Sequence, residues 1–306
     1  MEITRLSEFK VDENSLIKVT MCGNIIELMY SERKSTGNTI RKLDDYHYVD
    51  IATGEVKEYN KTINRAQSPN ELRKTFKKIR DVINCNTDKP YKCRWVTLTY
   101  KQRDSEEDAP EPMTDPKKLY RDVEAYIKRL RRRVGHFEYI QVAEPQRSGA
   151  WHVHMVMIFP KRAPFIDNRD MEIIWGNGWT DTQPMDKRDN LGAYLSAYLG
   201  DIFIDEVKDI KTALNIQGLE IKEVEFKGKK KSVIKGGRLH MYPAKFNILR
   251  CSRGVKRPEV IYMSEEMAQK KVSSAKLTFE KTIRLSDKDN DFENTINYRY
   301  YNSIRK

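Results

Sequence analysis

The runs EYIQVAE (138–144) and AWHVHMVMIF (150–159) decide the fold of this 306-residue chain. Both are rich in apolar side chains, and the polar segment PQRSG (145–149) separates them, which predicts two antiparallel strands joined by a hairpin loop. A third run of the same kind, WVTLTY (95–100), precedes them and predicts another buried strand. The centre of the fold is therefore expected to be an antiparallel sheet.

Three segments around these strands predict helices. Ser68-Pro69-Asn70-Glu71 is a capping box with proline at the first helical position, and Asp115-Pro116 opens a second helix. The third is LGAYLSAYLGDIF (191–203), capped by Asn190. The apolar stripes of the first two helices are Leu72, Phe76, Ile79 and Ile83, and Leu119, Val123, Tyr126 or Ile127, Leu130 and Val134. This order indicates an α+β fold, a central antiparallel sheet with packed helices.

The two ends of the chain differ in character from this region. Residues 1–65 contain short strand-like runs between polar turns, and we interpret them as an accessory β-rich N-terminal region. Residues 66–262 hold the predicted sheet, the helices and a basic, strand-like stretch that starts at 218. Residues 263–306 are mostly polar, and we interpret them as a peripheral helix or tail. The sequence therefore predicts one central domain with an appendage at each end.

Composition limits the class of protein. Apolar residues make up 39% and charged residues 33% of the chain, as in soluble globular proteins. The sequence has neither a transmembrane run nor the apolar core of a secretory signal, so we expect a cytoplasmic protein without a membrane partner. Four scattered cysteines without a C-x-x-C pair favour free thiols over a structural zinc site. The net charge of +12 makes nucleic acid the first candidate partner.

His152 and His154 are two residues apart in a predicted strand, so both imidazoles leave the same face and can share one ion. Such a pair taken alone is more often two hydrogen-bonded or partly exposed histidines. Hydrophobic neighbours indicate that this strand is buried, and buried imidazoles need a partner. Glu144 is a candidate oxygen ligand that would recruit Mg²⁺ or Mn²⁺. It faces His152 if the loop has seven residues; with six the face flips, and Gln141 is the alternative.

Tyr194 and Tyr198 are four residues apart and therefore adjacent on the surface of one predicted helix. Tyrosine pairs with this spacing are most often packing residues. A tyrosine hydroxyl is nonetheless a competent nucleophile towards a phosphodiester, provided that a metal ion polarises the phosphate. The two tyrosines are therefore candidate nucleophiles only together with the histidine site.

The order WVTLTY, WHVHMVM and YLSAYLG resembles the three motifs of the HUH (His-hydrophobe-His) endonucleases, specifically their two-tyrosine replication initiators. Within that superfamily the chain looks most like the phage gene II and gene A type replication proteins and their plasmid relatives. The stretch RLHMYPAKFNILRCSRGVKRP (238–258) is part of this likeness, which spans roughly residues 90–260. The resemblance implies that residues 66–262 are a nickase domain that initiates rolling-circle replication.

The resemblance also implies roles for single residues. Thr97 and Thr99 would lie beside the site, and His152, His154 and Glu144 would hold the divalent metal. Tyr194 or Tyr198 would attack the scissile phosphate, leaving a 5′-phosphotyrosine and a free 3′-hydroxyl that primes a host polymerase. The second tyrosine would then run the terminating strand transfer. The implied partners are origin DNA, single-stranded or in a hairpin at the nick site, a separate host helicase and the polymerase.

The chain departs from the family pattern beside the tyrosines. Relatives commonly have a lysine just before the second tyrosine or three residues after it, where this chain has Ala197 and Asp201. Either a basic residue from elsewhere substitutes, or the motif is aligned imperfectly; the candidates are Lys187, Arg188, Arg238 and Lys245. The candidate DNA-binding residues are Arg131, Arg132, Arg133, Lys187, Arg188, Arg238, Lys245, Arg250 and Arg253. For the three arginines at 131–133, a solvated cluster that suits a helix C-terminus is the alternative.

Other functions compete with this hypothesis. The sequence contains no G-x-x-x-x-G-K-[ST] motif, so we expect no helicase activity in the chain itself. A relaxase or a single-strand transposase would share the metal and tyrosine chemistry. A DNA-binding protein without catalysis would use the basic segments while both tyrosines pack. Metal-dependent cleavage distinguishes the enzymes from the binding protein.

Overall fold

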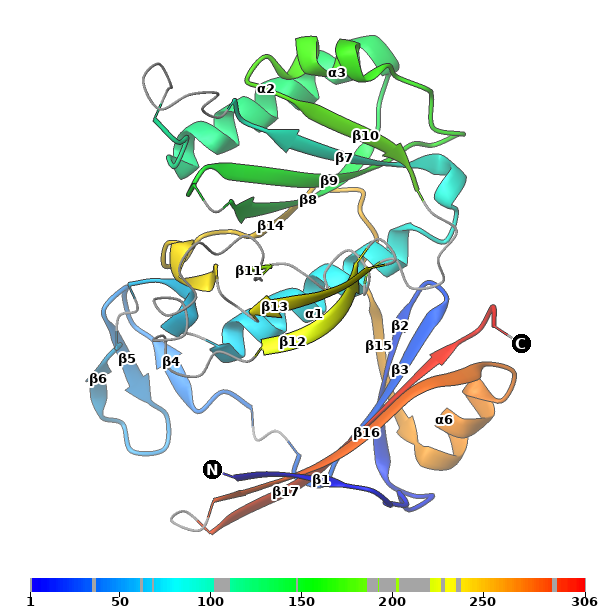
Figure 1. Cartoon of the computed structure of the whole chain (residues 1–306). Coiled ribbons are helices and arrows are strands. Elements are labelled where there is room, and N and C mark those ends of the chain that lie inside the picture. Colours follow the sequence, from blue (N-terminus) through cyan, green and yellow to red (C-terminus); the bar gives the residue numbers. More distant parts are fainter. Residues whose placement is uncertain are drawn as a thin grey trace. The chain divides into compact units, whose positions relative to one another are not determined.

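The fold is described from a computed structural model of the chain (Figure 1). It describes all residues except 1, 35–36, 61–62, 68, 102–110, 147, 186–191, 193–201, 204–220, 227–228, 235–237, 288–290 and 306. The chain forms two compact units, one of Ile63–Arg257 and the other of Met1–Thr62 with Pro258–Lys306. Each unit has its own cluster of buried apolar side chains.

The unit Ile63–Arg257 is built on a five-stranded antiparallel sheet with the order β10-β7-β9-β8-β14. The strands are β7 (Cys93–Thr99), β8 (Glu138–Pro145), β9 (Trp151–Ile158), β10 (Thr180–Pro184) and β14 (Leu249–Cys251). The three predicted strands are confirmed as the central three. The edge strand β14 comes from the basic stretch 238–258, which brings that stretch beside β8.

Two of the three predicted helices are confirmed, and the structure contains another helix that the sequence did not predict. Helix α1 is Pro69–Asn86, and helix α2 is Pro116–Val134 with the Asp115 side chain accepting from the Lys117 amide. Helix α3 (Asn168–Trp175) covers a segment that the sequence left without an element, because it has only eight residues. Of the predicted helix 191–203, Gly192 is helical, whereas Ile202–Phe203 form strand β11 instead; the rest lies outside the described residues.

Strand β11 belongs to a small three-stranded sheet with β12 (Ile221–Phe226) and β13 (Lys229–Ile234). Backbone pairing with β13 is the physical reason that Ile202 and Phe203, predicted to end a helix, form a strand instead. The hairpin β12–β13 agrees with the strand-like character expected from residue 218 onward.

The helices cover opposite faces of the five-stranded sheet (Figure 1). Trp151 donates its indole N–H to the carbonyl of Thr114, just before α2, and the Tyr100 hydroxyl donates to Asp122 of α2. Both residues project from the face opposite the histidines, so α2 packs there, with α3 beside it. Helix α1 lies on the histidine face, where the Cys93 thiol donates to the carbonyl of Asn86. The histidine face is therefore partly covered by α1.

The second unit is a six-stranded antiparallel sheet that both ends of the chain build together, in the order β1-β16-β17-β3-β2-β15. Its strands are β1 (Glu2–Leu6), β2 (Leu16–Cys22), β3 (Ile25–Ser31), β15 (Glu259–Ser264), β16 (Lys276–Asp287) and β17 (Phe292–Asn302), with helix α6 (Glu265–Val272). This differs from the sequence-based interpretation of 263–306 as a peripheral helix or tail. Buried polar side chains such as Asn297 and Arg299 hide the strand pattern of this hairpin.

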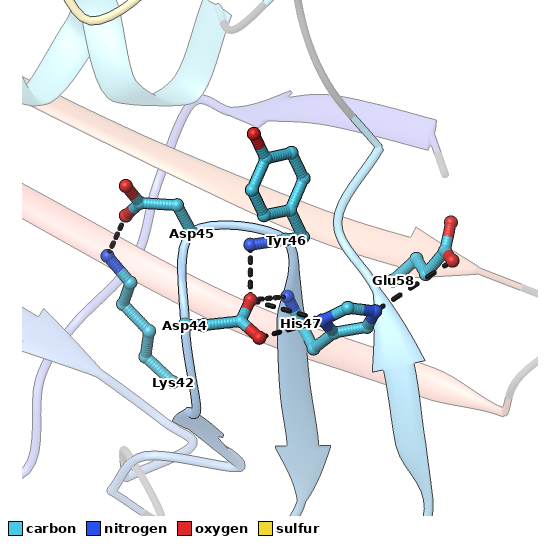
Figure 2. Close-up of polar contacts among 6 residues, drawn as sticks. All are labelled: Lys42, Asp44, Asp45, Tyr46, His47 and Glu58. Carbon is cyan, nitrogen blue, oxygen red and sulfur yellow. Dashed lines mark hydrogen bonds and ion pairs between the residues drawn. The ribbon is translucent and has the colours of Figure 1, made fainter.

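A small sheet of β4 (Ile40–Lys42), β5 (His47–Asp50) and β6 (Val56–Glu58) completes this unit. Figure 2 shows that the Asp44 carboxylate closes the β4–β5 turn by accepting from the amides of Tyr46 and His47 and from the His47 ring. The hydrogen bond from the His47 ring, then that from the Tyr46 amide, lowers the pKa of Asp44 to about 2. Among the described helices, none is long and apolar enough to cross a membrane.

Candidate active site

The register of the three central strands gathers the predicted site on one face. His152 lies opposite Thr99 on β7 and opposite Glu144 on β8, and His154 lies opposite Thr97. The hairpin loop therefore has the longer of the two lengths considered, and Glu144 faces the same side as His152. Gln141 pairs with Met155 on the other face, away from the histidines.

His152 is held by a hydrogen bond on each side of its ring. Its Nε2 is 2.5 Å from the Thr99 hydroxyl oxygen, and its Nδ1 is 3.1 Å from the side-chain amide of Gln146. Burial, and then the neighbouring His154, lower the pKa of His152 to about 3. The ring is therefore neutral near pH 7, the form in which an imidazole binds a metal ion.

His154 lies beside His152 with its ring centroid 5.2 Å away. Its Nδ1 is 3.4 Å from the Thr97 hydroxyl, and its Nε2 is 3.3 Å from the Glu144 carboxylate. The ring also stacks on Trp95 at a centroid distance of 5.3 Å. Strand β7 thus fixes both histidines, through two threonine hydroxyls and one indole.

Arg238 completes the polar cluster. Its Nη2 is 2.8 Å from the Glu144 carboxylate, and its Nη1 donates to the Pro145 carbonyl at 3.4 Å. The segment after it is anchored by aromatic packing, because Phe246 stacks on Trp151 at 4.4 Å and Tyr242 lies 6.0 Å from the same ring. Tyr242 is fully buried, so it is a packing residue, and burial raises its pKa.

These residues fit a divalent cation, although their donor atoms are engaged with one another. Among the described residues, no three His, Cys, Asp or Glu side chains converge as a formed metal cluster. His154 Nε2 and the Glu144 oxygen are nonetheless 3.3 Å apart, close to the roughly 3 Å between neighbouring ligands that each lie about 2.1 Å from one ion. Two imidazole nitrogens and one carboxylate suit Mn²⁺ or Mg²⁺. His152, His154 and Glu144 would hold such an ion.

The tyrosines and two of the basic candidates, Tyr194, Tyr198, Lys187 and Arg188, lie outside the described residues. One residue of their segment is described. The Gly192 amide donates to the Asn84 side chain of α1 at 2.8 Å, and a Cβ at Gly192 would lie 2.1 Å from the Arg80 carbonyl oxygen. Gly192 therefore packs closely on α1, the helix on the histidine face, two residues before Tyr194.

The other basic candidates lie in different places. Arg131 donates to the Phe137 carbonyl, Arg133 pairs with Asp170, and Arg132 is exposed on the same α2 turns, which belong to the face opposite the histidines. Arg250 lies over the Tyr120 ring of α2, on that same face. Lys245 and Arg253 are exposed on either side of β14. Of the described candidates, Arg238 is the one in contact with the histidine site.

The structure adds residues that the motif analysis missed. Gln146 contacts His152, and Asn84 contacts Gly192. Gln146 lies in a loop and Asn84 in an ordinary helix, and neither position carries a local sequence signal. Trp95 could have been found, because it lies on the same strand face as Thr97 and Thr99 by period-2 spacing.

The positive charge of the chain lies in the unit that holds this site. Residues 63–257 contain 39 lysines and arginines against 26 acidic residues, whereas 1–62 and 258–306 together contain 18 against 19. The net charge is thus +13 in the first unit and −1 in the second. An anionic partner is therefore expected at the unit with the histidines.

Residues 93–202 match the model of a family of replication-associated proteins, described as the ORF2 and gene 2 protein type. The match covers strands β7 to β10, both histidines and the two tyrosines, and it confirms the resemblance to replication initiators of the rolling-circle type. No curated protein and no solved structure matches the chain. Residues 93–202, about a third of the chain, are therefore similar to replication-associated proteins of the rolling-circle type, a likeness that supports a role in DNA replication.

Proposed function

We propose that the chain nicks one strand of its replication origin and later rejoins it, using a tyrosine nucleophile and a divalent metal ion. The observation that carries the proposal is the strand register, which sets His152, His154 and Glu144 on one face of a sheet. This sheet lies in the region whose residues 93–202 match a replication-associated family. The contact of Gly192 with α1 supports a tyrosine segment on that same face.

The chemistry is a transfer of one phosphoester bond. The hydroxyl oxygen of Tyr194 or Tyr198 bonds to the scissile phosphorus and gives its proton to water, while the bond from phosphorus to the 3′-oxygen breaks and that oxygen takes up a proton. The products are a 5′-phosphotyrosine and a free 3′-hydroxyl. A metal ion held by His152, His154 and Glu144 would supply Lewis-acid polarisation of the phosphate.

The residues around the histidines have their own part in this scheme. Thr97, Thr99 and Gln146 hold the imidazoles in place, so that little reorganisation is needed when the site forms. The basic character of residues 63–257 would attract the DNA strand, and helicase and polymerase would be separate proteins.

The test is capture of the covalent intermediate. The full-length protein is incubated with a random-sequence single-stranded DNA library in Mn²⁺, Mg²⁺ or chelator, and adducts that survive denaturing electrophoresis are sequenced. We expect metal-dependent adducts that share one cleaved sequence. Tyr194→Phe and Tyr198→Phe together should abolish them, and each single variant shows which hydroxyl acts first.

Matched variants separate the catalytic proposal from its rival. His152→Asn and His154→Asn should remove the adduct and leave strand binding within about threefold, because they alter the metal site and not the basic surface. Binding without any adduct in either metal would instead support a DNA-binding protein without catalysis. Adducts that survive in the double tyrosine variant would place the nucleophile elsewhere.

A further inference from the structure

Arg238 brings a positive charge into the histidine face of the sheet. Its side chain is only 15% exposed, and its Nη2 lies 2.8 Å from Glu144. The sequence supplies no cation at Ala197 or Asp201, beside the tyrosines. We propose that Arg238 is the cation that orients the scissile phosphate, and that Glu144 holds it in place until the DNA strand binds. This inference rests on the proposed nicking function.

The position of Arg238 is fixed by packing. It directly precedes the short 3-10 helix η4 (Leu239–Met241), whose C-terminal cap is the fully buried Tyr242. The Arg65 amide donates to the Tyr242 carbonyl, and strand β14 pairs with β8 about ten residues further along. An arginine fixed in this way loses little side-chain freedom when it binds a phosphate.

The contacts of Arg238 leave hydrogen-bonding capacity unused. One nitrogen makes a short contact with Glu144, the Nη1 contact with Pro145 is long at 3.4 Å, and Nε has no partner in the described part of the chain. The buried Arg299 of the other unit also has an Nε without a partner, but both of its terminal nitrogens bind the two oxygens of Glu265 at 2.5 and 2.6 Å. A guanidinium with open donors next to a metal site is suited to a phosphate oxygen.

Glu144 connects the two positions proposed for Arg238, one paired with Glu144 and the other bound to the scissile phosphate. Its carboxylate contacts both His154 and Arg238, so the same group serves as a candidate metal ligand and as the partner of the guanidinium. With a divalent ion bound, the Glu144 carboxylate would share its negative charge with that ion, and its attraction for Arg238 would weaken. Arg238 can then turn to the phosphate that the tyrosine attacks.

The test compares Arg238→Gln and Arg238→Lys with the control Arg169→Gln, an exposed arginine of α3 on the opposite side of the sheet. The substrate is the oligonucleotide recovered by adduct capture. We expect single-turnover adduct formation to fall about 100-fold in Arg238→Gln and to recover in part in Arg238→Lys. Strand affinity should change no more than in the control, and Mn²⁺ affinity without DNA should be unchanged or tighter.

A charge-neutral substrate provides the decisive comparison. An oligonucleotide with a methylphosphonate at the scissile position lacks the oxygen charge that Arg238 would stabilise. It should slow the wild type strongly and slow Arg238→Gln little further, because each change removes one half of the same interaction. The proposal would be overturned if the substitution and the methylphosphonate slowed adduct formation by independent factors that multiply. Loss of Mn²⁺ binding in Arg238→Gln would overturn it too. A wild type without adducts would overturn the nicking function as well, whereas normal adduct rates in Arg238→Gln would overturn this inference alone.

Discussion

At the level of single residues, the clearest energetic feature is the ion pair between Glu265 and Arg299. Both side chains are 8% exposed, and the guanidinium contacts the two carboxylate oxygens at 2.5 and 2.6 Å. Burial raises the pKa of Glu265, but hydrogen bonds from Arg299 and Gln269 outweigh it and leave the pKa below 4.5. The carboxylate therefore stays charged inside the protein because its partner is present.

Removing one partner of this ion pair should lower the free energy of unfolding far more than removing both partners. We expect Arg299→Met to lower the free energy of unfolding by about 3–5 kcal/mol, because it leaves a buried charge unpaired, and Glu265→Met with Arg299→Met to recover much of the loss. Urea denaturation at pH 7 measures both. The contribution of the carboxylate is complete above its ordinary pKa of 4.5 and disappears as the pH falls through the lowered value. Equal losses in single and double variants would show that the two residues do not act as a pair.

The site illustrates which residues a sequence can reveal. His152 and His154 share a face because of strand period alone, so their spacing was sufficient to predict it. Whether Glu144 faces the same side as His152 depended on the length of one loop, which the sequence left open. The contacts of Gln146 and Arg238 depend on where a loop and a distant segment fold back, and no local pattern encodes them.

At the level of elements, Gly192 is the described contact between helix α1 and the sequence segment that contains Tyr194 and Tyr198. The Gly192 amide donates to Asn84, and the Arg80 carbonyl leaves no room for a side chain at position 192. Gly192→Ala should therefore displace the segment and lower adduct formation at least about tenfold, while Mn²⁺ affinity stays unchanged because the histidines belong to β9. Adduct formation is quantified on denaturing gels, and Mn²⁺ affinity is measured by calorimetric titration.

Asn84→Ala tests the same contact from the other element. It leaves the Gly192 amide without this acceptor, a loss of about 1–3 kcal/mol in holding the segment. Lys74→Ala is the matched control, because Lys74 is an exposed residue of α1 with a surface ion pair to Glu71. Adduct yields that fall equally in Asn84→Ala and Lys74→Ala would indicate general damage to α1 and contradict a positioning contact.

Elements were predictable where local chemistry marks them. Proline at the first position and the Asp115 cap located the starts of α1 and α2, and the apolar stripe of α2 is buried as expected. The hairpin β16–β17 escaped prediction because its strands bury asparagine, threonine and arginine side chains, which satisfy one another by hydrogen bonds. Apolar alternation, the signal for strands, is weak there.

At the level of the whole molecule, the sequence did not reveal that residues from both ends share one sheet. Strand β2 pairs with β15 and β3 pairs with β17, so each pair joins the first strands of the chain to its last. Pairing over such distances is set by tertiary structure and has no local signature. The predicted boundaries at 65 and 262 lie near the junctions of the two units at 62 and 257, but the two end regions form one unit instead of two appendages.

The division of charge between the units predicts a division of labour in DNA binding. Residues 63–257 carry the whole positive excess, with 39 basic against 26 acidic residues. A fragment of these residues, first checked for folding by circular dichroism, should bind single-stranded DNA of random sequence with the same salt dependence as the full chain. The slope of log affinity against log salt counts phosphate contacts, at about −0.7 for each contact on a single strand. A slope reduced by half in the fragment would show that the neutral unit also contacts phosphates, despite its 18 basic and 19 acidic residues.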